Sequence, residues 1–146
     1  MLRIHRLYIK TALVYLLLGV MAGGWMLLAR AGVVPEAPER LYTIHIHLLG
    51  VGFLLLMVCG VAQWMFPRKS GESREQAARD PLGWTAYLLI TVGLAVRVIG
   101  ELLPAVFRSG LLAASVLMQV GGVLAFVVAI WPRVYLPSAK PPVEKR

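Results

Sequence analysis

The sequence predicts an all-α integral membrane protein, a four-helix bundle with both termini in the cytoplasm. Of its 146 residues, 59% are hydrophobic and 15% are charged, whereas soluble domains contain roughly 45–50% apolar and about 25% charged residues. The mean hydropathy is +0.75. Four apolar segments of roughly bilayer length alternate with short polar stretches. We expect one domain of four transmembrane helices over 1–136, and a disordered basic tail over 137–146.

The first span is expected over about 9–29. Its start overlaps the end of a short basic arm over 1–10. A basic start, an apolar core and small residues are also typical of a signal peptide. The apolar run continues past the glycines to Leu28, so we predict a transmembrane helix instead. Gly19 and Gly23 form a small-x-x-x-small pair, a pattern that lets a neighbouring helix approach closely.

The second span is expected over about 41–66, after a linker that Pro35 and Pro38 keep from being helical. It exceeds the roughly 20 residues that a bilayer requires, so it should tilt or project. The stretch 67–81 that follows is the most polar of the chain, and we predict a solvated loop there.

The third and fourth spans are expected over about 83–101 and 108–131. Small and polar residues mark the helix faces that contact other helices in membranes. By this criterion the third and fourth spans present inward faces that consist of Gly93, Arg97, Gly100 and Glu101 on the third, and Ser115, Gln119, Gly122 and Phe126 on the fourth.

The orientation follows from lysines and arginines, which gather on the cytoplasmic side of membrane proteins. One side of the membrane would carry Arg30, Arg40 and Arg108, with Arg97 near its edge. The other side carries eleven basic residues, namely Arg3, Arg6, Lys10, Arg68, Lys69, Arg74, Arg79, Arg133, Lys140, Lys145 and Arg146. The richer side is predicted to be cytoplasmic, in a multi-pass protein of a bacterial inner membrane. This placement at span ends, without interleaved aromatics, argues against nucleic acid as a partner.

Two of the three histidines, His45 and His47, lie about one turn inside the second span. An ionisable side chain at that depth is costly, so it indicates a functional site. Residues two apart on a helix are separated by about 200°, so these two side chains cannot face the same way. His45 shares its face with Gly52, Cys59 and Gln63 and should point inward. His47 should then point toward lipid, a neighbouring helix or a second subunit.

A bare metal ion requires three or four protein donors, and no spacing in these spans brings that many together. A heme requires only one or two axial ligands, apolar walls and cations for its propionates. His45, as the inward-facing histidine, is the expected axial ligand, with His47 as the alternative. Met26, at the same depth of the first span, could be the sixth ligand of the iron. The open alternative is that both histidines are structural and bind nothing.

Arg97 and Arg40 lie at the membrane level of these histidines and could hold an anionic group such as a heme propionate. Arg97 is also spaced i, i+4 from Glu101, so the alternative is that these two charges neutralise each other. Two residues carry no expected function: the single Cys59 is predicted to be a small buried hydrophobe, and His5 is expected at the surface of the cytoplasmic arm.

The run from His45 to Gly50 (HIHLLG), followed by a long apolar stretch and then WMFPR at 64–68, resembles the second transmembrane helix of a family of small four-helix membrane proteins. Those proteins are similar to part of the catalytic subunit of heme-copper oxidases and nitric oxide reductases. The run 119–126 also resembles the small family. The resemblance implies that His45 or, one register away, His47 ligates a low-spin heme.

The chain lacks the later helices on which the large enzymes carry their second heme ligand and their copper site. The resemblance therefore implies a heme b protein for one-electron transfer or a redox accessory role, and no oxygen or nitric oxide reduction. No complete catalytic site is evident, so an electron carrier is expected rather than an enzyme with its own substrate. A homodimer, a quinol or a respiratory complex are the expected partners. The alternative is a non-catalytic accessory or assembly subunit with structural histidines.

Overall fold

The computed structural model describes residues 2–68 and 71–134, with only the backbone described for Arg74. Within those residues the chain is all-helical, and four helices are long and apolar enough to cross a membrane. They are Arg3–Arg30, Leu41–Met65, Glu75–Leu102 and Ala105–Arg133. The prediction of an all-α chain with four helices long and apolar enough to span a membrane is confirmed, while the tail predicted over 137–146 lies outside the described residues.

The first span is one helix, and the second is divided into three parts because its middle has π-helical geometry. In chain order the elements are α1 (Arg3–Arg30), α2 (Leu41–His47), the π-helix η1 (Leu48–Leu55), α3 (Leu56–Met65), α4 (Arg74–Ala78), α5 (Pro81–Leu102), α6 (Ala105–Ile130) and the 3₁₀ turn η2 (Trp131–Arg133).

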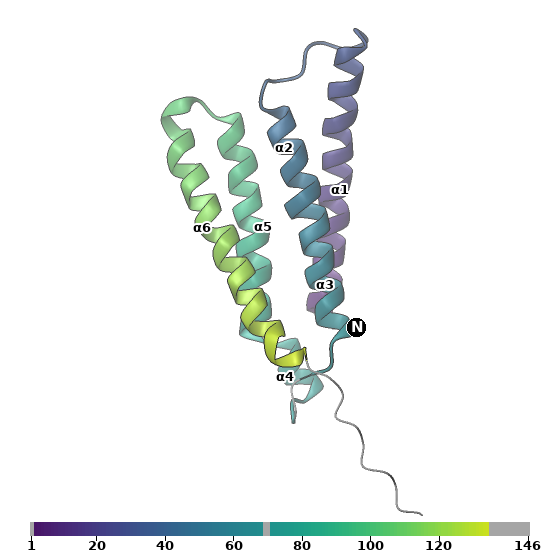
Figure 1. Ribbon diagram of the computed structural model, residues 1–146, viewed down its shortest axis with the longest axis vertical. Helices are drawn as coiled ribbons and strands as arrows, with labels where there is room; N and C mark the ends of the chain where they lie inside the picture. Colours follow the sequence, from purple (N-terminus) through teal and green to yellow (C-terminus); the bar gives the residue numbers. More distant parts are fainter. Residues whose placement is uncertain (1, 69–70, 135–146) are drawn as a thin grey trace, which may run out of the picture.

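The helices form two antiparallel hairpins that lie side by side (Figure 1). One hairpin pairs α1 with the α2–η1–α3 helix, and the other pairs α5 with α6. We call the end with the two short connections, 31–40 and 103–104, the loop end. The opposite end carries the start of α1, the loop with α4 and the turn η2, and we call it the termini end. Figure 1 shows α6 diverging from α2 toward the loop end.

Hydroxyl groups on one face of α1 join the two hairpins. Their hydrogen bonds are Tyr8 Oη to the Gly83 carbonyl at 3.0 Å, Thr11 Oγ1 with Tyr87 Oη at 2.8 Å, and Tyr15 Oη to the Thr91 carbonyl at 3.1 Å. With no water in the bilayer core to compete, hydrogen bonds between helices contribute to their association. The core around the Tyr8 bond includes Ile4, Leu56, Cys59 and Ile90. The prediction of a buried Cys59 is therefore confirmed.

Glycines set the distances between paired helices. A Cβ built on Gly19 of α1 would lie 2.6 Å from Leu49 Cδ2, and one on Gly122 of α6 would lie 2.7 Å from Ile90 Cγ1. Both distances are far below van der Waals contact, so only glycine allows these approaches. The close approach predicted from Gly19 is confirmed, and the inward face predicted for the fourth span meets α5.

The termini end differs from the sequence-based expectation in two ways. The predicted basic arm is already helical from Arg3, and His5 is buried, at 7% exposure, rather than a surface residue. His5 lines a pocket together with the end of α3 and Arg133, an arrangement of distant segments that the local sequence does not reveal. The predicted solvated loop contains the short helix α4, which starts at a capping box in which Ser73 and Gln76 bond each other's backbone N–H.

Candidate functional site

His45 packs against α1 and joins it to α2. Its Nδ1 lies 2.8 Å from the Gly19 carbonyl oxygen, and a Cβ built on Gly23 would lie only 2.7 Å from its Cε1. Because a carbonyl oxygen can only accept, Nδ1 carries the proton of this imidazole. The imidazole ring therefore occupies the space that a side chain at position 23 would need. This contact explains why the second member of the predicted small-x-x-x-small pair is a glycine.

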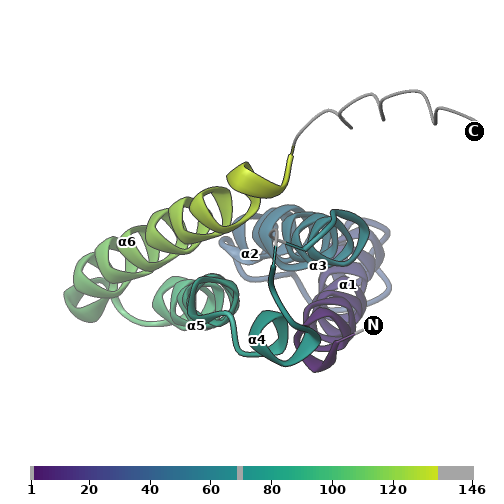
Figure 2. The ribbon, with the colours of Figure 1, turned by 90° about the horizontal axis from the view of Figure 1, so that it is seen from below.

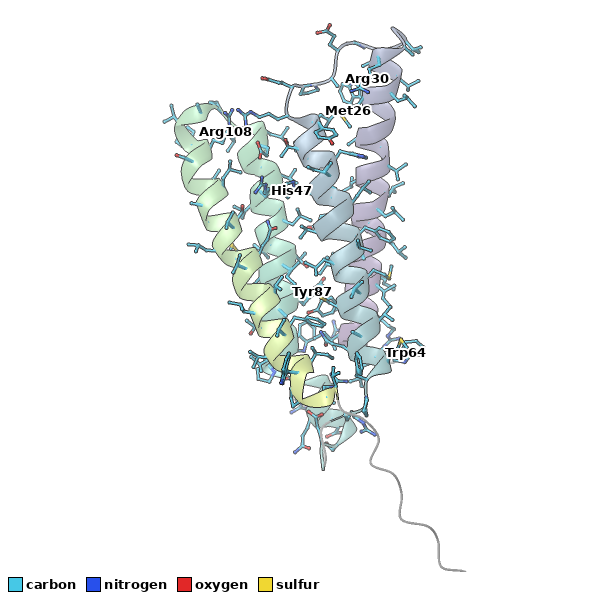
Figure 3. All side chains as sticks on the ribbon, viewed as in Figure 1. Met26, Arg30, His47, Trp64, Tyr87 and Arg108 are labelled. Atoms are coloured by element: carbon cyan, nitrogen blue, oxygen red, sulfur yellow. The ribbon has the colours of Figure 1, made fainter. Side chains whose placement is uncertain are left out.

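His47 lies on the side of α2 that faces away from α1. Its Nδ1 is 2.8 Å from the Thr43 carbonyl, one turn earlier in the same helix, so Nδ1 again carries the proton. In Figure 3 the residue lies on the side of α2 toward α5. Its side chain is half-buried. The expectation that the two histidines face different ways is confirmed.

The two histidines leave the same nitrogen free for other chemistry. Within the described part of the chain, neither Nε2 makes a hydrogen bond, and neither is among the fully buried polar atoms without a partner. Each Nε2 therefore keeps some accessible surface, and in the neutral imidazole this nitrogen carries the lone pair. For His45 this nitrogen lies within 3.5 Å of the Cβ position of Gly23, so α1 crowds it. Nε2 of His47 has no such neighbour among the contacts described.

The π-helix η1 begins at the residue after His47. Such segments are rare, occur mostly inside α-helices and are frequent at functional sites. Two glycines, Gly50 and Gly52, weaken the α-helix there. A Cβ on Gly52 would collide with Tyr15 and Leu94, whereas one on Gly50 would meet nothing within 4 Å. One flank of the helix beyond His47 is therefore open.

Glu101 binds two arginines at the loop end. Its side chain is 5% exposed and accepts from Arg40 Nη1 at 3.2 Å and from Arg97 Nη2 at 3.4 Å. One carboxylate cannot neutralise two guanidinium groups, so this cluster keeps a net positive charge. The geometry favours charge neutralisation as the first role of Arg97. Its Nε is buried without a partner, so the side chain still has an unused donor.

Met26 lies on α1 about one turn beyond Gly23, which His45 contacts (Figure 3). The ring of His45 touches α1 directly, so this arrangement leaves no layer between them in which a macrocycle could lie. His47 is on the opposite side of α2. The structure therefore does not bring Met26 and a histidine to the two faces of one heme within a single chain.

Among the described residues, no group of three or more His, Cys, Asp or Glu side chains is arranged to hold a metal ion. A macrocycle needs only one axial donor from each chain, and an imidazole with Nδ1 fixed and Nε2 open meets that requirement.

Two of the cavities that were not anticipated from the sequence lie at opposite ends of the bundle. An apolar groove of about 490 Å³ runs between α1, α2 and α5 near the loop end, and neither His45 nor His47 lines it. A polar pocket of about 470 Å³ lies at the termini end and includes His5 and Gln63. The signal available for the second was Gln63 itself, an uncharged polar residue at the end of an apolar span.

No family model, curated protein or solved structure matches this chain. Its function is therefore inferred from the residues of the chain itself.

Proposed function

We propose that this protein binds heme b in the membrane and acts in one-electron transfer or as a redox accessory protein, with His47 as an axial ligand. The supporting observation is the 2.8 Å hydrogen bond from His47 Nδ1 to the Thr43 carbonyl. Metal-ligating histidines nearly always donate their other N–H to a carboxylate, carbonyl or water, which fixes the tautomer and the ring. When bound, the heme would supply an iron that cycles between the ferric and ferrous states.

His45 has the same tautomer but a different role in this proposal. Its hydrogen bond crosses to the Gly19 carbonyl of another helix, and its ring fills the space beside Gly23. It would hold α1 and α2 together and set the position of His47 two residues later. The family resemblance, which allows either register, is compatible with this choice.

The second axial ligand would come from another copy of the chain. A two-fold axis would bring two His47 side chains to one bis-histidine heme, or create two equivalent hemes near the interface. The flank of the helix just beyond His47 is available for such contact, because a Cβ on Gly50 would meet nothing within 4 Å. Arg97, with its unused Nε donor, is the residue proposed to attract a propionate at this level.

The setting we propose is a multi-pass protein of a bacterial inner membrane, with a quinol or a respiratory complex as electron partner. The second candidate function is a non-catalytic accessory or assembly subunit. It is favoured by the hydrogen bond between His45 and Gly19, because this bond alone is enough to explain the presence of a histidine at position 45.

Absorption spectra of the purified protein, oxidised and then reduced with dithionite, test the proposal. We expect a b-type spectrum that His47→Ala largely abolishes, with about one heme per two chains if the ligand pair is shared. His45→Ala should retain much of the heme but unfold at lower temperature. A wild-type protein that takes up no heme would favour the accessory subunit, and full occupancy in His47→Ala would contradict the ligand assignment.

A further inference from the structure

The polar pocket at the termini end is formed by parts of the chain that are distant in sequence. The start of α1, the end of α3, the loop with α4 and the turn η2 all contribute to its wall. Two polar side chains in this wall, His5 and Gln63, are more than nine-tenths buried, at 7% and 4% exposure. Trp64, at 55% exposure, also lines the pocket and lies near the end of α3 (Figure 3).

An apolar groove adjoins this pocket. It has a volume of about 440 Å³ and follows the exposed face of α3 away from the termini end. Met65 and Phe66 line both the pocket and the groove, so the two share a wall. The other groove residues are Met57, Val58, Val61 and Ala62. A polar pocket joined to one apolar groove matches a molecule with a polar head and a single apolar chain.

The charges around the pocket favour a head without net charge. Its described lining includes two basic residues, Arg68 and Arg133, and two acidic residues, Glu72 and Asp80. Arg133 is occupied with the end of α3 and the two residues after it, because its guanidinium donates to the carbonyls of Gln63, Phe66 and Pro67 at 2.8 to 2.9 Å. The other charged residues of the described lining, Arg68, Glu72 and Asp80, carry a net negative charge, which disfavours an anionic lipid headgroup.

The pocket also has hydrogen-bonding capacity that the protein does not use. His5 Nδ1 and Gln63 Nε2 are buried and have no hydrogen-bond partner. Buried polar groups are nearly always paired, and both side chains line the pocket. An amide N–H and an imidazole suit a neutral carbonyl or hydroxyl group.

We propose that this pocket and groove bind one isoprenoid quinone, with the carbonyl-bearing ring between His5 and Gln63 and the prenyl chain along α3. A quinone has an uncharged head that accepts hydrogen bonds and a single apolar chain, which are the two properties that the cavities select. The site lies at the opposite end of the bundle from His47, and its existence does not depend on bound heme.

Binding can be measured with the full chain in nanodiscs of phosphatidylcholine, titrated with a decyl-tailed benzoquinone while tryptophan fluorescence is recorded. We expect saturable quenching that Trp64→Phe largely removes. Gln63→Leu, which deletes the head contact, and Val58→Phe, which fills the groove, should each weaken binding about tenfold or more. Leu54→Phe is the matched control, since it adds a ring to an exposed position of the same helix outside the groove.

Val58 is 53% exposed, so its variant keeps the test valid if Gln63→Leu fails to fold. Quenching that rises without saturation, or that is equal in Val58→Phe and Leu54→Phe, would overturn the proposal. So would displacement of the quinone by phosphatidylglycerol at equal mole fraction, which would identify an anionic lipid site. His47→Ala should bind the quinone normally, so failure of the heme assignment and failure of this one are distinguishable.

Discussion

His45 and His47 show how two residues of one type, two positions apart, come to have different chemistry. Both donate Nδ1–H to a backbone carbonyl, but the acceptor of His45 is on α1 and that of His47 is on α2 itself. The first bond joins two helices, whereas the second only fixes the ring. Helical phase is enough to predict that they face apart, but not which one α1 covers closely, because that depends on how the helices pair.

Replacing Gly23 with alanine tests the packing of His45. The new Cβ would lie 2.7 Å from His45 Cε1, so the ring must move and the bond to Gly19 weakens. We expect the free energy of unfolding to fall by about 1–3 kcal/mol relative to the control, the usual cost of overpacking. Gly24→Ala is the control, since nothing lies within 4 Å of that position and the gain in helix propensity, about 1 kcal/mol, is the same.

Circular dichroism during thermal unfolding in detergent gives the comparison. Gly23→Ala should melt below Gly24→Ala and should also lose heme affinity if His45 positions His47. Equal melting temperatures for the two alanine variants would show that the ring does not depend on the glycine beside it.

At the scale of the elements, the loop end is joined by charge. Glu101, at the end of α5, binds Arg40, which precedes α2, and Arg97 on its own helix. Breaking a buried ion pair by removing one partner typically costs about 3–5 kcal/mol because a charge stays behind unpaired. Here Arg40 is 43% exposed, so solvent screens part of that cost.

We therefore expect Glu101→Gln to lower the free energy of unfolding by about 1–3 kcal/mol, because it leaves both arginines without a counter-charge. Arg97→Gln should cost less, since Glu101 keeps Arg40. The double replacement should be milder than Glu101→Gln alone, because only the half-exposed Arg40 remains. Glu39→Gln, an exposed neighbour, is the control. Chemical denaturation of the four variants gives the ranking, and a double variant less stable than Glu101→Gln would contradict it.

The elements also mark how far the sequence predicts the fold. The four spans are predicted by apolar runs about as long as a bilayer requires. This signal can be read from each segment by itself, without knowing its contacts with other segments. The π-helix after His47 and the burial of His5 depend on contacts between distant segments, and residue spacing does not reveal them. Assigning residues to helix faces at about 100° per residue assumes α-helical geometry, which η1 lacks. The predicted inward residues Gly52, Cys59 and Gln63 are nevertheless buried.

At the scale of the whole molecule, the surface is compatible with a multi-pass membrane protein. Large apolar side chains are exposed along every long helix, including Leu17 at 62%, Leu54 at 59%, Ile99 at 52% and Leu117 at 75%. Such continuous apolar exposure is rare on soluble monomers. The helices satisfy their own backbone groups, as a hydrocarbon environment requires. Between the hairpins, the hydroxyl hydrogen bonds of α1 combine with an apolar core that includes Ile4, Leu56 and Ile90.

The direction of insertion is the last prediction. Both described ends of the chain lie at the termini end (Figure 1), so they are on one side of the membrane whichever way the bundle inserts. Lysines and arginines flank the spans far more densely at this end than at the loop end, and short basic loops are retained in the cytoplasm. We expect green fluorescent protein fused to the C-terminus to fluoresce. Alkaline phosphatase, which is active only after export, should be inactive there and active when inserted at Gly32 in the loop between α1 and α2. The reverse pattern would place His47 near the cytoplasm and the quinone pocket near the outer face, and would exclude the proposed orientation of both sites.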